Sequence, residues 1–150
     1  MTIWNYAAIG LAMGVTAAIC VSIGFCGIGE CPGTNQESAL ILVLAGLGGV
    51  IGGVAVAQLF GRSGWIGLQL ALGGALLATW IGSLTASIGI ILVNDTMIAA
   101  IARDALELSF AGLLLLIVIW PAGLMWIILM SGIHIMARRM RRDVPQKASV

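Results

Sequence analysis

Charged residues are scarce in this sequence. Only 9% of its 150 residues are Asp, Glu, Lys or Arg, whereas a soluble domain carries roughly a quarter. Hydrophobic residues make up 61% of the chain, and the mean hydropathy is +1.13. This composition excludes an ordinary water-soluble fold and predicts an integral membrane protein. We expect membrane lipids around it and no nucleic-acid partner.

Charge is entirely absent from four long stretches of the chain. A bilayer core about 30 Å thick needs roughly 20 mostly apolar residues per helix. The four stretches that exceed this length without a charge are Met1 to Gly29, Ser38 to Gly61, Ser63 to Asn94 and Leu108 to Ala137. They predict an all-α four-helix membrane bundle, a single domain over residues 1–150. We expect the spans at about residues 4–26, 39–60, 65–93 and 109–136, followed by a cytoplasmic basic tail at 138–150.

The middle of each predicted span therefore holds no ionisable carboxylate, amine or guanidinium. Proton-coupled carriers and many ion pathways depend on such groups inside the membrane, so a charge-based transport mechanism is disfavoured. A hydroxyl series in the third span, Thr79, Ser83, Thr85 and Ser87, leaves open a pore within an oligomer. Helix packing accounts for the same residues.

Cations gather after the fourth predicted span. Excess Lys and Arg beside a span mark the cytoplasmic side, so we expect both termini inside, an N-in/C-in arrangement, in a bacterial inner membrane. The Arg62 turn then lies inside as well. The loop around residues 30–37 and the segment 95–107 lie outside, where Arg103 is the only cation. The basic anchor, which also attracts anionic headgroups, consists of Arg138, Arg139, Arg141 and Arg142.

Small residues recur every four positions in the first three spans and so line a face of each helix. The ridges are Gly10, Gly14, Ala18 and Ser22; Ala45, Gly49, Gly53 and Ala57; and Gly67, Ala71, Ala75, Thr79, Ser83 and Ser87. Lipid gives helices no hydrophobic drive to associate, so close packing at such ridges carries much of the attraction. We expect a compact bundle of the first three spans. Its predicted helix contacts are Gly10, Gly14, Gly49, Gly53, Gly67 and Ala71.

The fourth predicted span has a different character, with large apolar side chains on nearly every face. Such a surface suits lipid or a partner helix, and we expect Leu114 and Ile117 to face outward. Pro121 removes one backbone donor within this span and favours a kink. The preceding residues 95–107 predict a short amphipathic helix. It either lies in the outer interface or extends the fourth span.

Reactive side chains are few. Cys26 and Cys31 lie at the outer end of the first span and in the following loop, where an oxidising compartment favours a disulfide between them. Cys20 lies within the span, which argues against a thiol relay, and two thiols without a nearby histidine do not make a zinc site. His134 lies near the cytoplasmic end of the fourth span. It is a candidate ligand of a haem or chlorin, or a candidate proton-transfer group. We otherwise expect neither metal nor cofactor.

No catalytic motif is present, and we expect no enzymatic activity. The contrast between small-residue ridges and a bulky fourth span favours an accessory or scaffold subunit of a larger membrane complex. It would pack on other subunits, or on itself, through the fourth span. The alternative is a homo-oligomeric channel or small-solute permease along the hydroxyls of the third span. A third alternative is a redox or pigment-bearing subunit that uses His134 or the cysteines.

Overall fold

The protein is built from helices. The computed structural model describes residues 3–27, 36–93 and 98–142, and within those ranges it contains no strand. Its elements are α1 (Ile3–Gly27), α2 (Gln36–Val56), the 3-10 helix η1 (Ala57–Leu59), α3 (Gly64–Val93), α4 (Ile98–Val118) and α5 (Trp120–Arg142). Four candidate membrane spans lie in Ile3–Gly24, Ala39–Leu59, Gly64–Gly89 and Trp120–Arg142. The predicted all-α membrane protein with four spans is confirmed.

Hydroxyl groups inside the helices are satisfied locally. In a bilayer a polar group without a partner is costly, and Ser or Thr within a helix solves this by bonding to the carbonyl four residues earlier. Such bonds, at 2.8–2.9 Å, join Thr16 to Ala12, Ser22 to Ala18, Thr79 to Ala75, Thr85 to Ile81 and Ser87 to Ser83. The spans can therefore carry hydroxyls without needing water.

The helix α2 packs between α1 and α3 and touches both closely. On the α1 side, a Cβ atom added to Gly53 would lie 3.0 Å from the Cα of Gly10. One added to Gly49 would lie 3.1 Å from the Cα of Gly14, and one added to Gly14 would lie 2.8 Å from the carbonyl oxygen of Gly46. The backbones of α1 and α2 therefore approach closely at these glycines, with no space for an added side chain.

The opposite face of α2 approaches α3 in the same way. A Cβ added to Gly48 would lie 2.8 Å from the Cα of Gly82, and one added to Gly52 would lie 2.9 Å from the Cα of Ala78. Glycines on two faces of one helix thus let α2 serve as the centre of a three-helix layer.

The small residues predicted to form one ridge on α3 do not all lie at the contact with α2. Gly67 lies against the backbone of Arg62 in the preceding turn, and Ala71 belongs to an apolar core that includes Phe60 and Ile9. The reason is geometric: a residue four positions along an α-helix is rotated by about 40°. Over the length from Gly67 to Ser87 this drift adds up to about half a turn, so the ridge cannot face one neighbour throughout.

A tight turn joins α2 to α3. After η1 the backbone becomes extended at Phe60, and both Gly61 and Gly64 have positive φ values, +76° and +82°. Glycine adopts this left-handed conformation without the steric penalty that a Cβ brings. The short glycine-flanked turn therefore makes α2 and α3 antiparallel neighbours.

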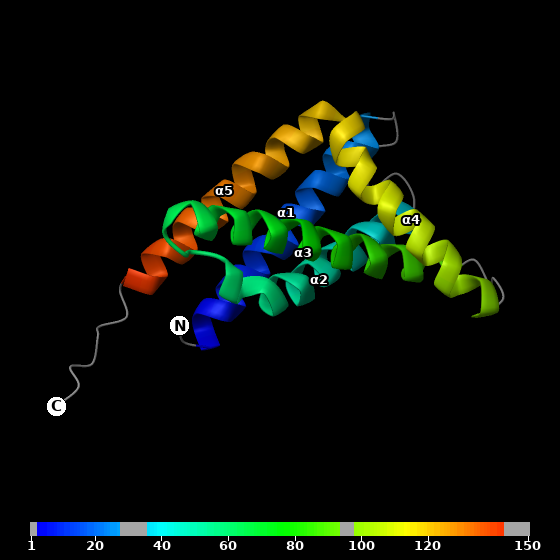
Figure 1. The fold of residues 1–150 in the computed structure, drawn as a ribbon. Coiled ribbons are helices and arrows are strands. Elements are labelled where there is room, and N and C mark those ends of the chain that lie inside the picture. The colour runs from blue at the N-terminus through cyan, green and yellow to red at the C-terminus, as the bar shows by residue number, and fades with distance from the viewer. Residues whose placement is uncertain (1–2, 28–35, 94–97, 143–150) are drawn as a thin grey trace.

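The predicted fourth span is divided between two helices. Within the predicted range 109–136, α4 ends at Val118 and α5 begins at Trp120, and the two meet as an inverted V (Figure 1). Pro121 explains the break, since it has no N–H for the carbonyl four residues earlier. Gly123 lies against the carbonyl of Leu116, which allows the two helices to fold close together at the bend.

The segment predicted as a short amphipathic helix is likewise part of α4. Its described residues, 98–107, continue without interruption to Val118, and the apolar portion of α4 is Ala105–Val118. This portion is shorter than the roughly 20 residues that a crossing needs. The fourth candidate span is accordingly α5 (Trp120–Arg142), and α4 precedes it as a separate helix.

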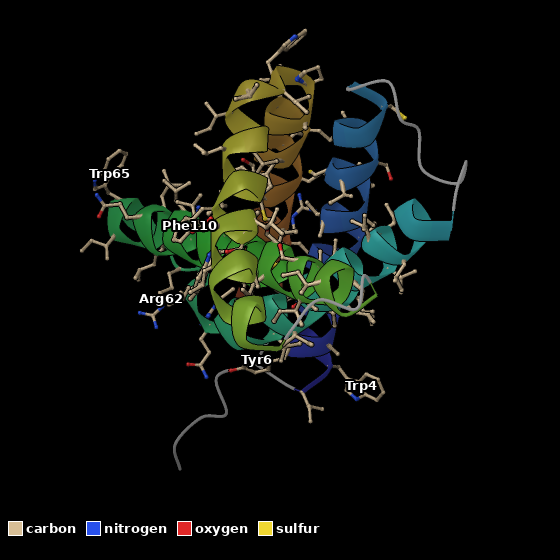
Figure 2. The ribbon with its side chains drawn as sticks, turned by 90° about the vertical axis from the view of Figure 1, so that its right-hand side faces the viewer. Trp4, Tyr6, Arg62, Trp65 and Phe110 are labelled. Carbon is tan, nitrogen blue, oxygen red and sulfur yellow. The ribbon has the colours of Figure 1, made fainter. Side chains whose placement is uncertain are left out.

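Three parts of the chain lie at one end of the molecule: the start of α1, the turn between α2 and α3, and the end of α5 (Figure 1). Trp4 and Trp65 project away from the helices near this end (Figure 2), and they are 79% and 72% exposed. Indole rings at span ends suit the headgroup region of a bilayer. The start of α2 and the bend between α4 and α5 lie at the opposite end.

Candidate functional site

A cavity of about 280 Å³ lies among the helices. All five α-helices contribute to its wall. The lining residues are Met13, Thr16, Ala17, Cys20, Val21 and Gly24 from α1; Ile41, Ala45 and Gly49 from α2; Ala78, Thr79, Gly82, Ser83, Ala86 and Ser87 from α3; Leu108, Gly112 and Leu116 from α4; Ile119; and Ala122, Trp126 and Met130 from α5. This cavity lies among all five α-helices, and it is the candidate site.

The cavity wall is almost wholly apolar, and none of the described residues that line it is charged. Its side-chain oxygens are hydroxyls, and each donates its proton to protein. Thr16, Thr79 and Ser87 donate to carbonyls of their own helices, and the Ser83 hydroxyl donates to the Ser109 carbonyl of α4 at 3.0 Å. The wall therefore presents lone pairs and hydrocarbon to its interior, with no spare O–H donor.

Two indole groups fasten the α4–α5 pair onto α3. The Trp126 Nε1 of α5 donates to the Thr79 Oγ1 at 2.9 Å, and the Trp80 Nε1 of α3 donates to the Ser109 Oγ of α4 at 3.0 Å. Ser109 is fully buried. These side-chain hydrogen bonds add to the apolar packing of Trp126 and Met130 of α5 against Met13 of α1, and they differ from the glycine contacts of α2.

Cys20 faces the cavity from α1. Its thiol is free and buried, and the Sγ lies 3.9 Å from the carbonyl oxygen of Ala122, a weak hydrogen bond. Cys26, near the end of α1, is disulfide-bonded. Its predicted partner Cys31 lies outside the described residues, so the pairing stays a prediction. Cys20 behaves as a small apolar residue that closes the wall between α1 and α5.

His134 packs against the turn between α2 and α3. Its Nδ1 accepts a hydrogen bond from the backbone N–H of Gly61 at 3.3 Å, and its ring lies 6.4 Å from the ring of Phe60. That nitrogen is engaged and is not available to a metal or porphyrin. The described residues contain no group of three or more His, Cys, Asp or Glu side chains that could hold a metal ion.

The predicted basic anchor separates into two kinds of arginine. Arg141 is half-buried and donates to two carbonyls of the same turn: its Nε to Phe60 at 2.9 Å, and its Nη2 to Gln58 at 2.8 Å. The other arginines of the anchor, Arg138, Arg139 and Arg142, are exposed. The lysine and the rest of the tail lie outside the described residues. Arg141 therefore ties the end of α5 to the turn, while the others are free to meet headgroups.

Leu114 and Ile117 are predicted to face lipid or a partner helix. Leu114 is 59% exposed and Ile117 is 78% exposed on α4. Neither lines the cavity. Phe110, also on α4, is 56% exposed and lies beside Trp80 of α3, their ring centroids 6.1 Å apart (Figure 2).

No family model, no curated protein and no solved structure matches the chain. What it does must follow from the chemistry of its own residues. The cavity itself was missed by sequence reasoning, although the hydroxyls of α3 that line it were noticed. The cavity depends on hydrogen bonds of Trp80 and Ser83 with Ser109. These residues are far apart in sequence, so no local pattern shows that they meet.

Proposed function

We propose that this protein is a non-enzymatic accessory or scaffold subunit of a larger membrane complex. The proposal rests on one observation: the four membrane spans are not equally buried within the protein. Only 22% of the α5 span is buried, compared with 33% of α1, 33% of α2 and 39% of α3. The α5 span is the least buried of the four, and a partner's helices would cover it.

The helix α4 adds to this argument. Its apolar part, Ala105–Val118, is too short to cross the membrane and carries large exposed side chains, among them Leu106, Phe110 and Leu114. Exposed apolar patches of this kind mark contact with a membrane or with another protein. The helix α4 is not one of the four candidate spans, and its exposed apolar surface suits contact with a partner subunit.

The test is to purify the protein in a mild detergent and to measure which chains accompany it in stoichiometric amount. The double variant Leu114→Ala and Ile117→Ala should lose the partner. A matched control is Leu47→Ala with Ile51→Ala, which removes the same residue types from the exposed face of α2 (53% and 61% exposed). The control should keep the partner. Equal retention in both variants, or no stoichiometric partner at all, would contradict the proposal.

The orientation that we propose places both termini in the cytoplasm of a bacterial inner membrane. The start of α1, the Arg62 turn and the basic end of α5 share one end of the molecule (Figure 1), which agrees with cations on the cytoplasmic side. A cysteine introduced at Ser149 should react only from the cytoplasmic side, and one at Thr34 only from outside. The reverse pattern would overturn the orientation.

A second candidate, a channel or small-solute permease, draws on one observation. The hydroxyls of Thr16, Thr79, Ser83 and Ser87 line the same cavity. Their protons already bond to carbonyls, so replacing the hydration shell of an ion there would break existing hydrogen bonds. Flux into liposomes that changes with Ser83→Ala or Ser87→Ala would favour this candidate. Absence of flux together with a stoichiometric partner would favour the accessory subunit.

A further inference from the structure

The cavity among the helices reaches the surface of the molecule. The cavity is partly open, and Leu108 of α4, which lines it, is also 45% exposed. Gly24 of α1 also lines the cavity, and a Cβ added there would meet no atom within 4 Å, so there is space beside it.

The cavity is elongated along α1. Met13 and Gly24 both line it and are separated by about 16 Å along α1, given a rise of about 1.5 Å per residue. The cavity, about 280 Å³ in volume, thus extends along about three turns of α1. An elongated space of this kind suits an extended hydrocarbon chain better than a compact ligand.

An empty space of this kind is unfavourable within a membrane. A cavity of about 150 Å³ with apolar walls stays dry and takes up apolar molecules, and atoms that line a void lose their dispersion contacts. This cavity is larger and equally apolar, and its opening beside Leu108 lies on an apolar helix. The surrounding bilayer supplies hydrocarbon chains that can fill it.

The polar atoms of the wall limit what can enter. The hydroxyls give their protons to carbonyls, and none of the described lining residues is charged. A carboxylate or phosphate would lose its hydration and find no cation or donor in return. A chain without a charged group, or one that ends in a hydroxyl able to donate to a Ser or Thr oxygen, meets no such penalty.

We propose that this cavity is a binding site for one uncharged hydrocarbon chain, which enters from the bilayer beside Leu108. The chain is either an acyl tail of a membrane phospholipid or a free long-chain alcohol, since both offer the same hydrocarbon to the wall. This site is independent of the proposed contact of α4 and α5 with a partner. Its failure would leave the accessory function untouched.

Photochemical labelling tests the site with two probes. Vesicles of phosphatidylcholine that contain the protein receive either a phosphatidylcholine with a diazirine in its acyl chain or a long-chain alcohol with a diazirine at the same depth. After irradiation, mass spectrometry locates the adducts. Adducts are expected on Met13, Trp126 or Met130, which are buried from bulk lipid at 1%, 9% and 8% exposure. Exposed Ile117 should be labelled in any case and serves as an internal reference.

Filling the cavity should remove the interior adducts only. Gly24→Leu places a side chain in open space within the cavity, and Gly73→Leu, on the exposed face of α3, is its matched control because a Cβ there also meets nothing. We expect Gly24→Leu to lower interior labelling about tenfold relative to Ile117, since a chain and a leucine cannot share the space. Gly73→Leu should leave it unchanged.

Each outcome decides the proposal. Interior labelling by the phosphatidylcholine probe, by the alcohol, or by both supports it and identifies the source of the chain. Absence of interior adducts from both probes in the unaltered protein overturns it, whatever the variants do. Interior labelling that Gly24→Leu leaves at its original level also overturns it, because the adducts would then arise outside the cavity.

Discussion

The helices α1, α2 and α3 and the helix pair α4–α5 are held in different ways. In the first group backbone meets backbone: a Cβ on Gly53 would lie 3.0 Å from the Cα of Gly10, and one on Gly52 would lie 2.9 Å from the Cα of Ala78. The α4–α5 pair is held mainly through side chains: Met13 of α1 shares an apolar core with Trp126 and Met130 of α5, and the Trp80 and Trp126 indoles donate hydrogen bonds between α3 and the pair, with a cavity between the helices.

This difference has consequences for what each region tolerates. Close backbone contacts make up much of the attraction between helices in lipid, and they cannot accommodate an added side chain. A contact made through side chains can adjust by changing their conformation, and the cavity beside it leaves space for movement. We therefore expect α1 to α3 to fix the fold and α4–α5 to remain adaptable toward a partner or a bound chain.

The largest effect should come from Gly52→Leu. Its Cβ would lie 2.9 Å from the Cα and 3.0 Å from the carbonyl oxygen of Ala78, so α2 and α3 must separate, at a cost of about 3 kcal/mol. Thermal unfolding in detergent should show a large loss of stability or no folded protein. Gly73→Leu, which meets no neighbour, should stay close to the unaltered protein. Similar losses in the two variants would contradict direct backbone contact.

Adding a single methyl group should have different effects on stability at two glycines of α2. A Cβ on Gly49 would lie 2.9 Å from the Cβ of Ala17, whereas the nearest atom to one on Gly46 is 3.7 Å away. Gly49→Ala should cost about 1 to 2 kcal/mol through crowding. Gly46→Ala should be neutral or stabilising by up to about 1 kcal/mol, because alanine is the better helix former. Changes of the same sign and size would show that the α1 contact is not tight.

The next effect concerns the turn between α2 and α3. Arg141→Ala removes two hydrogen bonds to the carbonyls of Gln58 and Phe60 and should lower the free energy of unfolding by about 1 kcal/mol. Arg142→Ala, an exposed neighbour, removes the same charge without those bonds. If both substitutions change the unfolding temperature equally, Arg141 acts only through its charge.

The smallest effect should come from removing the hydrogen bond between Trp126 of α5 and Thr79 of α3. The Trp126 indole donates to the Thr79 hydroxyl at 2.9 Å, and hydrogen bonds between membrane helices average about 0.6 kcal/mol. A double-mutant cycle with Trp126→Phe and Thr79→Val should return a coupling energy of about that size. Strict additivity would mean that this hydrogen bond does not help to hold α5.

The sequence predicts the first three spans closely and the fourth only in part, and the difference has a physical reason. Apolar stretches without charge have few alternatives to a crossing helix, so α1, α2 and α3 lie close to their predicted ranges. Pro121 was correctly linked to a distortion, but a missing N–H can bend a helix or end it, and the outcome depends on contacts such as that of Gly123 with Leu116. The fourth span therefore begins later than predicted.

The candidate site was harder to predict because it depends on several helices at once. Glycine spacing predicts the contacts of α2 with α1, because such a contact depends only on one face of each helix. The cavity depends instead on how far α4 and α5 are held from α1, which is set in part by Ser109 and Thr79 meeting the two indoles. No periodicity within one span contains that information.

The most direct measurement compares two variants for both unfolding and partner recovery. Gly53→Leu inserts bulk where its Cβ would lie 3.0 Å from the Cα of Gly10, and it should abolish the compact fold. Leu114→Ala combined with Ile117→Ala removes exposed side chains of α4, and it should leave the unfolding temperature nearly unchanged while a stoichiometric partner is lost. Equal loss of stability in the two variants, with the partner lost only because the protein unfolds, would contradict the separation between a fold-determining layer and an adaptable helix pair.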